Sequence, residues 1–492
     1  MSIHAFVHLG YLFHVHCFHL KGGLSDRHFL VVDTSNITVK VSPNQAYLLF
    51  IIREIIFDLT NMLAKVCLML LHILTAVSGA AVTTDSNVVN VTSSPPRILQ
   101  YRQTLGLPPV VWRAPIGCDI SGFFVEILAF FTGLVPFFHN DKLFLDVGRC
   151  SHFETFTSKD TIMLKGLQAS FSSHPPEWKD AIVIHHKLPG QAVPPALSSS
   201  LYLVGRMMTE STILSKKEVH QSQVFDEIWV PSSFHVSVFS THGVPPHKLH
   251  VMPEAVDVQF YSDSDTSGDA TIPSRGEVFR FLSVFKYEKR KGADILLSSY
   301  WKSFKKEDPV ELVIRSYKPS WEPGSSDLMK AFNNFARKEF GCPMSELASV
   351  VWLKGDLTKH GLRSLYQSAA VFVLPTRGEG WCLPCAEALA TGTPLLVTAF
   401  SGPAAYLSEE HSYPLSHATS LNVDGTVEPN GTHLSQLMRH VFTAHPSELL
   451  EKSIKAKEFA AKYFEPSIVA LKVIKRLNAI RDDLSTTSHI EL

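Results

Sequence analysis

The residues best suited to chemistry are two carboxylates, Glu379 and Glu387, which have the seven residues Gly-Trp-Cys-Leu-Pro-Cys-Ala between them. We expect Glu379 in a loop and Glu387 in the first turn of the following helix, so that they flank one ligand from two sides. Free N–H groups at a helix start, together with the helix dipole, favour a phosphate or diphosphate. Carboxylates beside it accept hydrogen bonds from hydroxyl groups. The pattern indicates a ligand with a diphosphate in the middle and hydroxyls at both ends, such as a nucleotide-sugar.

The flanking sequence predicts the elements that position these carboxylates. An apolar run at 369–376 is typical of a buried strand, and Pro384 suits the first turn of a helix, where its missing N–H costs nothing. Gly392 suits the end of that helix, and residues 395–399 form the next expected strand. Strand, loop, helix and strand make one parallel βαβ unit, whose ligands lie beyond the carboxyl ends of the strands.

This segment resembles the Glu-x7-Glu signature of the retaining, two-domain glycosyltransferases of family 4, also described as glycosyl transferases group 1. The resemblance implies that Glu379 faces the hydroxyls of the transferred sugar and that Glu387 binds the ribose hydroxyls. Backbone N–H groups between them would line the sugar and the diphosphate, from Gly380, Trp381, Cys382 and Leu383. Cys382 stands where the family usually has glycine, so a positive φ or a close ligand approach there would be costly.

A cluster of cations follows the strand expected at 279–285, in the sequence Lys-Tyr-Glu-Lys-Arg-Lys-Gly of residues 286–292. Cations at the carboxyl end of a strand suit a diphosphate leaving group, whereas a charge run taken alone indicates a solvated face. The resemblance assigns Lys291 to the diphosphate, because it precedes a glycine as in the family. The upstream arginine of the family is absent, so Lys286 or Arg290 is its expected substitute.

Four more site residues follow from the resemblance. Gly122 belongs to the loop that lies under the donor diphosphate in the family, with a buried turn as the equal alternative. His186 or its neighbour His185 ends a strand, and a histidine in such a place contacts the sugar. A histidine whose hydrogen bonds are satisfied in a loop is the alternative. Trp352 lies on the strand that reaches the nucleobase, and Glu210 is a candidate contact on the acceptor side.

Cys382 and Cys385 form a Cys-x-x-Cys pair at the expected helix start. Such a pair is either a redox pair or half of a metal site, or it consists of two small buried residues beside a ligand loop. No second Cys-x-x-Cys exists to complete a zinc site. We therefore favour the buried pair, because cysteine is among the most often buried residues.

Length and composition indicate a globular protein of several domains, since 492 residues contain 45% apolar and 18% charged residues. The net charge of −1 and the lack of a large basic block argue against a nucleic-acid partner. We expect an α/β protein in which two Rossmann-like domains face each other across a cleft, the GT-B arrangement. The expected divisions are an extension at 1–107, an acceptor domain at 108–262, a donor domain at 276–462 and a helix at 463–480 that crosses back.

The N-terminal region has its cleanest charge-free run at 66–82, which is marginal for a membrane span. The stretch that begins at Met62 resembles a secretory signal peptide, so we expect a signal-anchor or a start at Met62, with an apolar helix packed on the enzyme as the alternative. Sequons at Asn36, Asn90 and Asn430 permit a luminal glycoprotein. A secretory or membrane-anchored (ER or Golgi) location is expected, with a cytoplasmic one as the alternative.

The reaction that the resemblance implies moves a sugar from a nucleoside-diphosphate sugar to a carbohydrate, lipid or protein hydroxyl, with the anomeric configuration retained. No metal or other cofactor is expected, because cations and N–H groups neutralise the diphosphate. The alternative is a catalytically inactive nucleotide-sugar-binding scaffold, which Cys382 and the missing arginine suggest. No Gly-x-Gly-x-x-Gly follows an expected strand, so a dinucleotide-dependent oxidoreductase is not expected.

Overall fold

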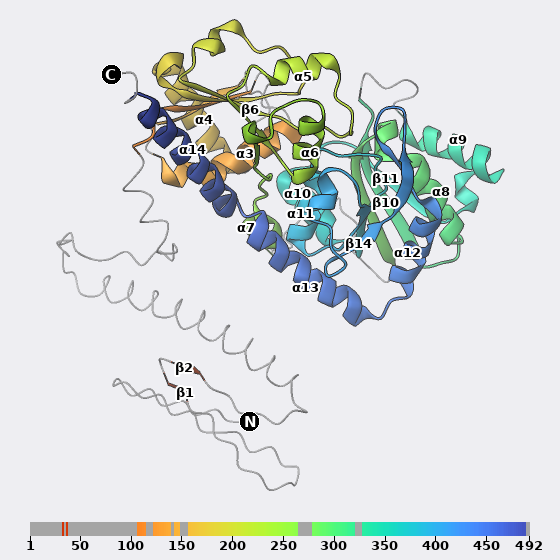
Figure 1. Ribbon diagram of the computed structural model, residues 1–492. Helices are drawn as coiled ribbons and strands as arrows, with labels where there is room; N and C mark the ends of the chain where they lie inside the picture. The colour runs from red at the N-terminus through yellow and green to blue at the C-terminus, as the bar shows by residue number, and fades with distance from the viewer. Residues whose placement is uncertain are drawn as a thin grey trace. The chain divides into compact units, whose positions relative to one another are not determined.

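The computed structural model describes residues 32–33, 36–37, 106–114, 122–138, 142–147, 156–263, 278–319 and 327–488 (Figure 1). The chain divides into two compact units, Met1–Ser93 and Ser94–Leu492. In the first unit the description covers only a short antiparallel pair, β1 (Val32–Asp33) and β2 (Asn36–Ile37). The predicted signal or anchor segment, its Met62 and the Asn90 sequon lie outside the described residues. Among the described helices, none is both long and apolar enough to span a bilayer.

The first domain of the second unit is built on a six-stranded, fully parallel sheet with the order β4-β3-β5-β6-β7-β8. The order reverses between β3 and β5, where a doubly wound sheet opens its binding crevice. Every residue of β5 and β7 is buried, as expected for strands that helices cover on both faces. The elements are β3 (Val110–Ala114), α3 (Gly122–Leu134), β4 (Leu143–Val147), α4 (Ser158–Ser173), β5 (Ile182–His186), β6 (Tyr202–Arg206), α5 (Lys216–Ser222), β7 (Glu227–Val230), α6 (Ser233–Thr241) and β8 (Leu249–Val251).

The second domain has another six-stranded parallel sheet, with the order β11-β10-β9-β12-β13-β14. Its order reverses between β9 and β12, so the loops that follow these two strands share one crevice. A separate hairpin of two antiparallel strands packs beside it. The elements are α7 (Val258–Ser262), β9 (Phe279–Lys286), α8 (Ala293–Ser303), β10 (Val310–Tyr317), α9 (Leu328–Phe340), β11 (Ser349–Leu353), α10 (Lys359–Gln367), β12 (Val371–Leu374), α11 (Leu383–Thr391), β13 (Leu395–Thr398), β14 (Ser412–Leu415), β15 (His417–Leu421), β16 (Val427–Pro429) and α12 (Gly431–Thr443).

The predicted strand–loop–helix–strand unit is confirmed as β12, α11 and β13. Gly392 ends α11 with φ +82°, the left-handed conformation that glycine adopts most easily. The expected first turn differs in one respect. Because α11 begins at Leu383, Glu387 is the fifth residue of the helix and lies in its second turn.

The last two helices join the two domains. α13 (Pro446–Tyr463) packs on α11 of the second domain, and α14 (Pro466–Ser488) packs on α3 of the first, so the pair runs across both (Figure 1). The helix expected at 463–480 corresponds to α14, which extends to Ser488. Apolar residues of α14, among them Val473 and Leu477, are fully buried in the core of the first domain.

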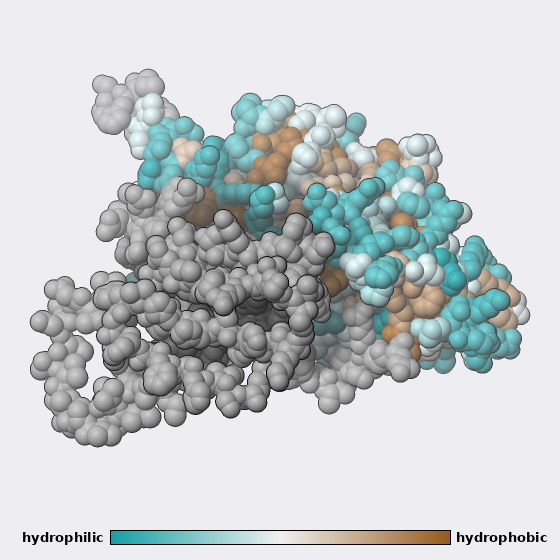
Figure 2. All heavy atoms as spheres, turned by 90° about the horizontal axis from the view of Figure 1, so that it is seen from below, coloured by the Kyte–Doolittle hydropathy of each residue, from teal (hydrophilic) through white to brown (hydrophobic). Residues whose placement is uncertain are grey.

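The visible surface of the described residues is largely hydrophilic, with smaller apolar patches between the polar areas (Figure 2). The second domain has one apolar core, centred on the strands of its sheet. The first domain has two apolar cores, one on each face of its sheet. This distribution is normal for globular domains, whose surfaces still contain apolar atoms. The fold therefore provides two stable sheets whose carboxyl ends carry the loops of the site.

The close approach of α3 and α14 gives a test of how the domains are held. A Cβ built on Gly133 would lie 2.1 Å from the carbonyl oxygen of Pro466. We expect Gly133→Ala to lower the free energy of unfolding by about 1–3 kcal/mol, the usual cost of overpacking. Urea-induced unfolding measures this value.

The matched control is Gly166→Ala in α4, because nothing lies within 4 Å of a Cβ built there. Alanine favours a helix over glycine, so this variant should gain up to about 1 kcal/mol. Equal unfolding midpoints for the two variants would contradict the close packing of α14 on α3.

Candidate functional site

The site begins where the loops after β9 and β12 meet. The loop after β9 forms a short 3-10 turn, Lys289–Lys291, and the chain then turns at Gly292 with φ +72°. A Cβ on Gly292 would lie 1.9 Å from the carbonyl oxygen of Pro375, so only glycine fits against the end of β12. The Arg377 N–H donates to the Arg290 carbonyl at 2.7 Å, which fixes the two loops to each other.

The centre of this crevice is the ion pair of Lys291 and Glu379. Lys291 Nζ lies 2.6 and 2.8 Å from the two carboxylate oxygens, and Thr376 Oγ1 donates to the same carboxylate at 3.1 Å. Glu379 is 5% exposed, and its N–H donates to Ser401 Oγ at 2.9 Å. Burial opposes its charge, but Lys291 and Arg290 hold the pKa of the Glu379 carboxyl below its usual value. The pair is therefore a buried, charged centre.

Arg290 extends this centre toward the first domain. Its guanidinium lies 3.3 Å from Glu379, 3.3 Å from Glu210 and 3.5 Å from Glu288, and it also donates to the Gly378 carbonyl at 2.5 Å. Glu210 belongs to the loop after β6 of the first domain, so this ion pair crosses between the domains. Two cations and three carboxylates thus converge on one place.

Glycines let the first-domain loop lie directly on the donor loop. A Cβ on Gly378 would lie 2.1 Å from the Glu210 carbonyl oxygen, and one on Gly380 would lie 2.4 Å from Met208 Sδ. Thr212 completes the contact, because its N–H and its hydroxyl both donate to the Gly425 carbonyl at 3.0 Å. The sequence did not predict the contacts of Met208 and Thr212. The two glycines that flank Glu379 were the only signal of a close approach.

The residues between the two predicted carboxylates are buried rather than open. The Trp381 ring packs on Tyr406 and Phe464, with centroids 4.9 and 5.7 Å apart, so only the backbone of Trp381 is available to a ligand. Tyr406 donates its hydroxyl to the Trp381 carbonyl at 2.7 Å. Leu383 lies beside Gly122, since a Cβ on Gly122 would be 3.8 Å from Leu383 Cδ1. The loop before Gly122, residues 115–121, lies outside the described residues.

Cys382 adopts φ +75° and ψ +73° and caps α11. The structure therefore has the positive φ at this position that would make a residue with a Cβ costly. It also corrects one prediction, because Cys382 and Cys385 are not two separate buried residues but are joined in a disulfide. Three residues apart at a helix start, the two sulfurs are close enough to bond. Within the described part of the chain, no group of three or more His, Cys, Asp or Glu side chains is arranged to hold a metal ion.

Glu387 lies apart from the Lys291–Glu379 pair. Its carboxylate accepts hydrogen bonds from the Tyr261 and Tyr366 hydroxyls, both at 2.8 Å, and burial raises its pKa. It lines a cavity of about 90 Å³ between α3, α7, α10 and the start of α11. The second turn of α11 directs Glu387 toward these two tyrosines, and the predicted binding of one ligand between Glu379 and Glu387 stays a prediction.

His186 is buried in the core of the first domain and does not touch the central ion pair. Its Nε2 lies 3.2 Å from Glu126, and its Nδ1 lies 3.5 Å from the Trp112 indole nitrogen. The predicted sugar contact of His186 and the alternative of a satisfied loop histidine both stay predictions. His185 is also 1% exposed, and burial lowers its pKa to about 4. Both rings lie at the end of β5 and are buried.

Glu126 is the centre of this second buried network. Arg206 lies 2.7 Å from its carboxylate, and both side chains are at most 1% exposed. Burial alone would raise the pKa of Glu126, but Arg206 and His186 lower it to about 2. Glu254 is buried nearby, and its pKa is raised well above the usual value by burial and by the charges of Glu126 and Glu379. The sequence analysis did not identify this carboxyl group, which no motif marks.

Lys286 and Trp352 lie at strand ends of the second sheet. Lys286 is the last residue of β9 and pairs in register with Tyr317. The Trp352 indole N–H donates to the Ser316 carbonyl at 2.8 Å, and the Lys354 ammonium lies 4.4 Å from the centre of its ring. Neither residue has a recorded interaction with the Lys291–Glu379 pair among the described residues. The Trp352 side chain is half-buried and lies on β11, the edge strand of the second sheet, where the nucleobase is predicted to bind.

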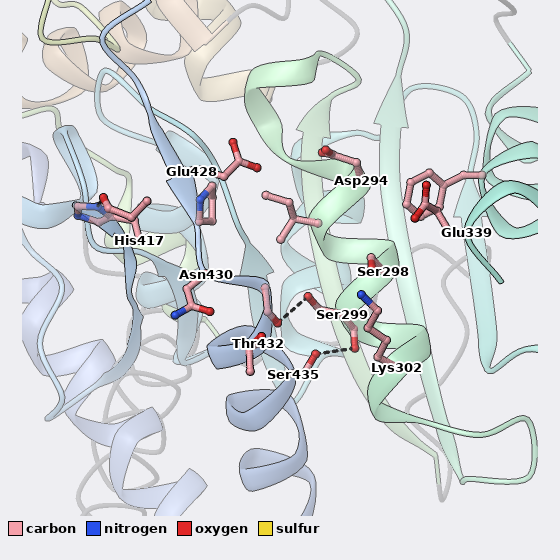
Figure 3. Close-up of a pocket in the computed structure, with 15 residues that line it drawn as sticks. Asp294, Ser298, Ser299, Lys302, Glu339, His417, Glu428, Asn430, Thr432 and Ser435 are labelled. Carbon is pink, nitrogen blue, oxygen red and sulfur yellow. Dashed lines mark hydrogen bonds between the residues drawn. The ribbon is translucent and has the colours of Figure 1, made fainter. Parts of the chain in front are cut away.

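A larger opening lies elsewhere on the second domain. A groove of about 810 Å³ runs between α8, α12 and the β15–β16 hairpin (Figure 3). Asp294 of α8 and Glu428 of β16 line it, and both form ion pairs of 2.8 Å with Arg377. None of the predicted catalytic or donor-binding residues lines this groove, so size alone does not locate the site. Its wall includes the sequon residue Asn430.

Comparisons with known proteins agree with this architecture. Residues 276–423 match the family described as glycosyl transferases group 1, and this stretch contains Lys291, Glu379 and Glu387. The second domain is a glycosyl transferases group 1 domain. No curated protein sequence matches the chain.

Solved structures show the fold of both domains together. HepE of Anabaena in complex with UDP and glucose is 11% identical over 75% of this chain and 100% of HepE, with a TM-score of 0.56. The trehalose-6-phosphate synthase OtsA is 11% identical over 75% and 99%, with a TM-score of 0.53. The N-terminal domain of trehalose-6-phosphate phosphatase from Candida albicans is 12% identical over 76% and 98%, with a TM-score of 0.52. The predicted GT-B fold is therefore confirmed, and identities this low establish the fold alone.

The buried network around Glu126 gives a second test. We expect Glu126→Gln to lower the free energy of unfolding by about 3–5 kcal/mol, because Arg206 then stays buried without its counter-charge. The pKa of Glu126 in the folded protein lies below its ordinary value of 4.5. The extra free energy of unfolding of the wild type over the variant is therefore fully present above pH 4.5 and is lost as the pH falls toward about 2. Denaturant unfolding at pH 7 and pH 3 measures both effects.

The control is Glu177→Gln, which removes a fully exposed partner of Lys179. Exposed pairs contribute little, so this variant should unfold as the wild type does at both pH values. A Glu126→Gln variant as stable as this control would contradict a buried charge network.

Proposed function

We propose that this protein is a glycosyltransferase that moves a sugar from a nucleoside-diphosphate sugar to an acceptor hydroxyl with retention of the anomeric configuration. The observation that carries this proposal is the buried Lys291–Glu379 pair, with Arg290 beside it, at the reversal point of a glycosyl transferases group 1 domain. Charged groups buried in a crevice are common at functional sites, because binding and catalysis need perturbed charges.

Lys291 and Arg290 are proposed to hold the diphosphate of the donor. Both are part of one turn after β9, and their recorded charged partners are carboxylates, which a diphosphate can replace as a negatively charged acceptor. The start of α11 follows Glu379 in the same loop, and the positive end of its helix dipole adds positive potential there. The sugar then lies against Glu379, whose carboxylate accepts hydrogen bonds from its hydroxyls.

The nucleoside is proposed to bind toward Glu387 and Trp352. Glu387 keeps a second lone pair on each oxygen beyond the bonds from Tyr261 and Tyr366, so it can also accept from ribose hydroxyls. Leu357 and Leu362 form an apolar side of the cavity that Glu387 lines, and such a side suits contact with the flat face of a nucleobase or of a ribose ring. This arrangement separates the two carboxylates by function, with one for the sugar and the other for the nucleoside.

The proposed step is a displacement on one face of the sugar. The bond from the anomeric carbon to the diphosphate oxygen breaks, the bond to the acceptor oxygen forms on the same face, and the acceptor proton passes to the departing diphosphate. Lys291 and Arg290 stabilise the charge that develops on the leaving group, which is the largest catalytic effect expected. These cations and N–H groups supply the neutralisation, so the proposal includes no metal ion.

A nucleotide-sugar-binding scaffold without activity is the second candidate. The observation that favours it is the contact of Glu210 with Arg290 and of Met208 with Gly380, which places first-domain side chains on the donor loop. Such a protein binds a donor but transfers no sugar. The HepE structure contains UDP and glucose, so UDP-glucose is the first donor to try for this chain.

The test of transfer is Lys291→Ala. Loss of one preorganised contact to a leaving group should lower kcat by about 10²–10³ with a smaller change in KM. The reaction is followed by release of the nucleoside diphosphate from UDP-, GDP- and ADP-sugars with simple sugar acceptors. Lys289→Ala is the matched control, since Lys289 is exposed in the same turn and has no contact with Glu379.

Four outcomes separate the candidates. A large loss in Lys291→Ala with a normal Lys289→Ala supports transfer through this site. Equal kcat values for the two variants contradict it. Donor binding by calorimetry without hydrolysis or transfer by the wild type supports the scaffold, and no binding of any nucleotide-sugar rejects both.

We extend the proposal to the secretory pathway, as an enzyme associated with it or anchored in its membrane. The Cys382–Cys385 disulfide supports this location, because disulfides persist in oxidising compartments. Asn430 is exposed at the start of α12, and its Oδ1 accepts from the His433 N–H at 3.0 Å. A glycan on Nδ2 would leave this helix cap in place.

Glycosylation of Asn430 is the measurable consequence. Expressed in mammalian secretory cells, the protein should lose mass on treatment with an N-glycosidase, and Asn430→Gln should reduce that loss by one glycan. Asn422→Gln is the control, since Asn422 lies in the same hairpin region without a sequon. No shift in the wild type would contradict the proposed location.

A further inference from the structure

We propose that the Cys382–Cys385 disulfide sets the conformation of the donor loop, so that affinity for a nucleotide-sugar falls when a dithiol reduces this bond. This inference rests on the proposed function and adds a positioning role and a redox dependence to the same site. Neither cysteine is proposed to touch the reacting atoms.

The backbone of Cys382 is the first reason. In the described part of the chain, only Cys382 and Ser401 have a positive φ without being glycine, with values of +75° and +57°. A Cβ disfavours this left-handed region, so a non-glycine residue stays there only when its surroundings hold it. The disulfide to Cys385 is a covalent tie across the four residues that turn from the loop into α11. We infer that it is one of the groups that hold Cys382 in this conformation.

The position of Cys382 is the second reason. Its carbonyl accepts the N–H groups of Cys385 at 3.0 Å and Ala386 at 3.2 Å, so Cys382 starts the helix as well as ending the loop. Glu379 lies three residues before it. A rotation of φ at Cys382 would therefore turn the preceding loop relative to α11 and move Glu379 and the loop N–H groups together. The donor site depends on that relative orientation.

The rest of the loop is already fixed on its other side. A Cβ on Gly402 would lie 2.0 Å from the Gly380 carbonyl oxygen, and the Glu379 carbonyl accepts the Gly402 N–H at 3.0 Å. Tyr406 holds the Trp381 carbonyl. Residues 379–381 are thus packed against 401–406, and the segment 382–385 is the connection through which they are joined to the helix. The disulfide joins the two ends of this connecting segment, Cys382 and Cys385.

The redox step is a thiol–disulfide exchange with an added dithiol. A thiolate of the dithiol attacks the sulfur of Cys382, a residue that is 5% exposed, and the Cys382–Cys385 bond breaks. Cys385 leaves as a thiolate in the first turn of α11, where the helix dipole favours negative charge, and then takes up a proton. The second thiol of the reagent displaces Cys382, so the protein gains two thiols and the reagent becomes a disulfide.

The experiment uses the full chain and titrates UDP-glucose by calorimetry before and after incubation with dithiothreitol. The wild type should bind about tenfold more weakly after reduction, which corresponds to about 1.4 kcal/mol. Alkylation with iodoacetamide followed by peptide mass analysis shows whether the 382–385 pair is oxidised before treatment and reduced after it. UDP, GDP-mannose and ADP-glucose are titrated in parallel.

Two double variants separate loop conformation from other effects of the cysteines. Cys382→Ala/Cys385→Ala should bind about as weakly as the reduced wild type, and dithiothreitol should not change it. Cys382→Gly/Cys385→Ala should bind more tightly than the alanine pair, because glycine adopts a positive φ without the Cβ penalty. Cys342→Ser is the control, since Cys342 is a free cysteine and its loss should leave the response to the dithiol intact. Near-ultraviolet circular dichroism confirms that each variant is folded.

Each result has one meaning. Three results would overturn the inference: equal affinity of the glycine and alanine double variants, a response of either double variant to dithiothreitol, or free thiols at 382 and 385 in the untreated wild type. In each of these cases, binding of UDP-glucose by the wild type still upholds the proposed function. If the oxidised wild type binds none of the four nucleotides, the proposed function is overturned and the inference with it.

Discussion

The structure of the site depends on one buried ion pair, Lys291 with Glu379. The two residues are 88 positions apart, and they meet because β9 and β12 are neighbours at the point where the strand order of the second sheet reverses. Burying either charge alone would be expensive, whereas the pair with its hydrogen bonds is tolerated. The two loops must therefore stay in register with each other, and Gly292 and the Arg290–Arg377 backbone bond keep them there.

The first domain contacts this site through the loop after β6, by backbone and side-chain atoms alike. Gly378 and Gly380 allow the loop after β6 to lie against the donor loop, and Glu210 reaches Arg290 from there. α14 holds the first domain from the opposite side by packing on α3. Because the domains touch at the charged centre itself, any movement between them changes the surroundings of Arg290.

Several features of the site could be predicted from the sequence because they are local. The apolar run before Glu379, Pro384 and Gly392 together define β12, α11 and β13 within one or two residues of their observed bounds. Lys291 was identified through the family resemblance, because it precedes a glycine as in the family. The environment of Glu387 was not predictable in this way, since Tyr261 comes from a helix 126 residues earlier. The burial of His186 was missed for a similar reason, because its partner Glu126 lies on another element.

Whereas the family resemblance marked residue 382 as a position where glycine is usual, the sequence by itself determined the order of strands and helices around Glu379 and the charged residue types in the loops after β9 and β12. These follow from hydrophobic periodicity, helix signals and the chemistry of side chains, all of which act over a few neighbouring residues. Only the tertiary structure decided which carboxylate pairs with Lys291, that Cys382 is bonded to Cys385, and that the first domain rests on Gly378 and Gly380. The physical reason is that strand order and domain packing bring distant segments together, and a side chain's charge and burial depend on those neighbours more than on its own place in the chain.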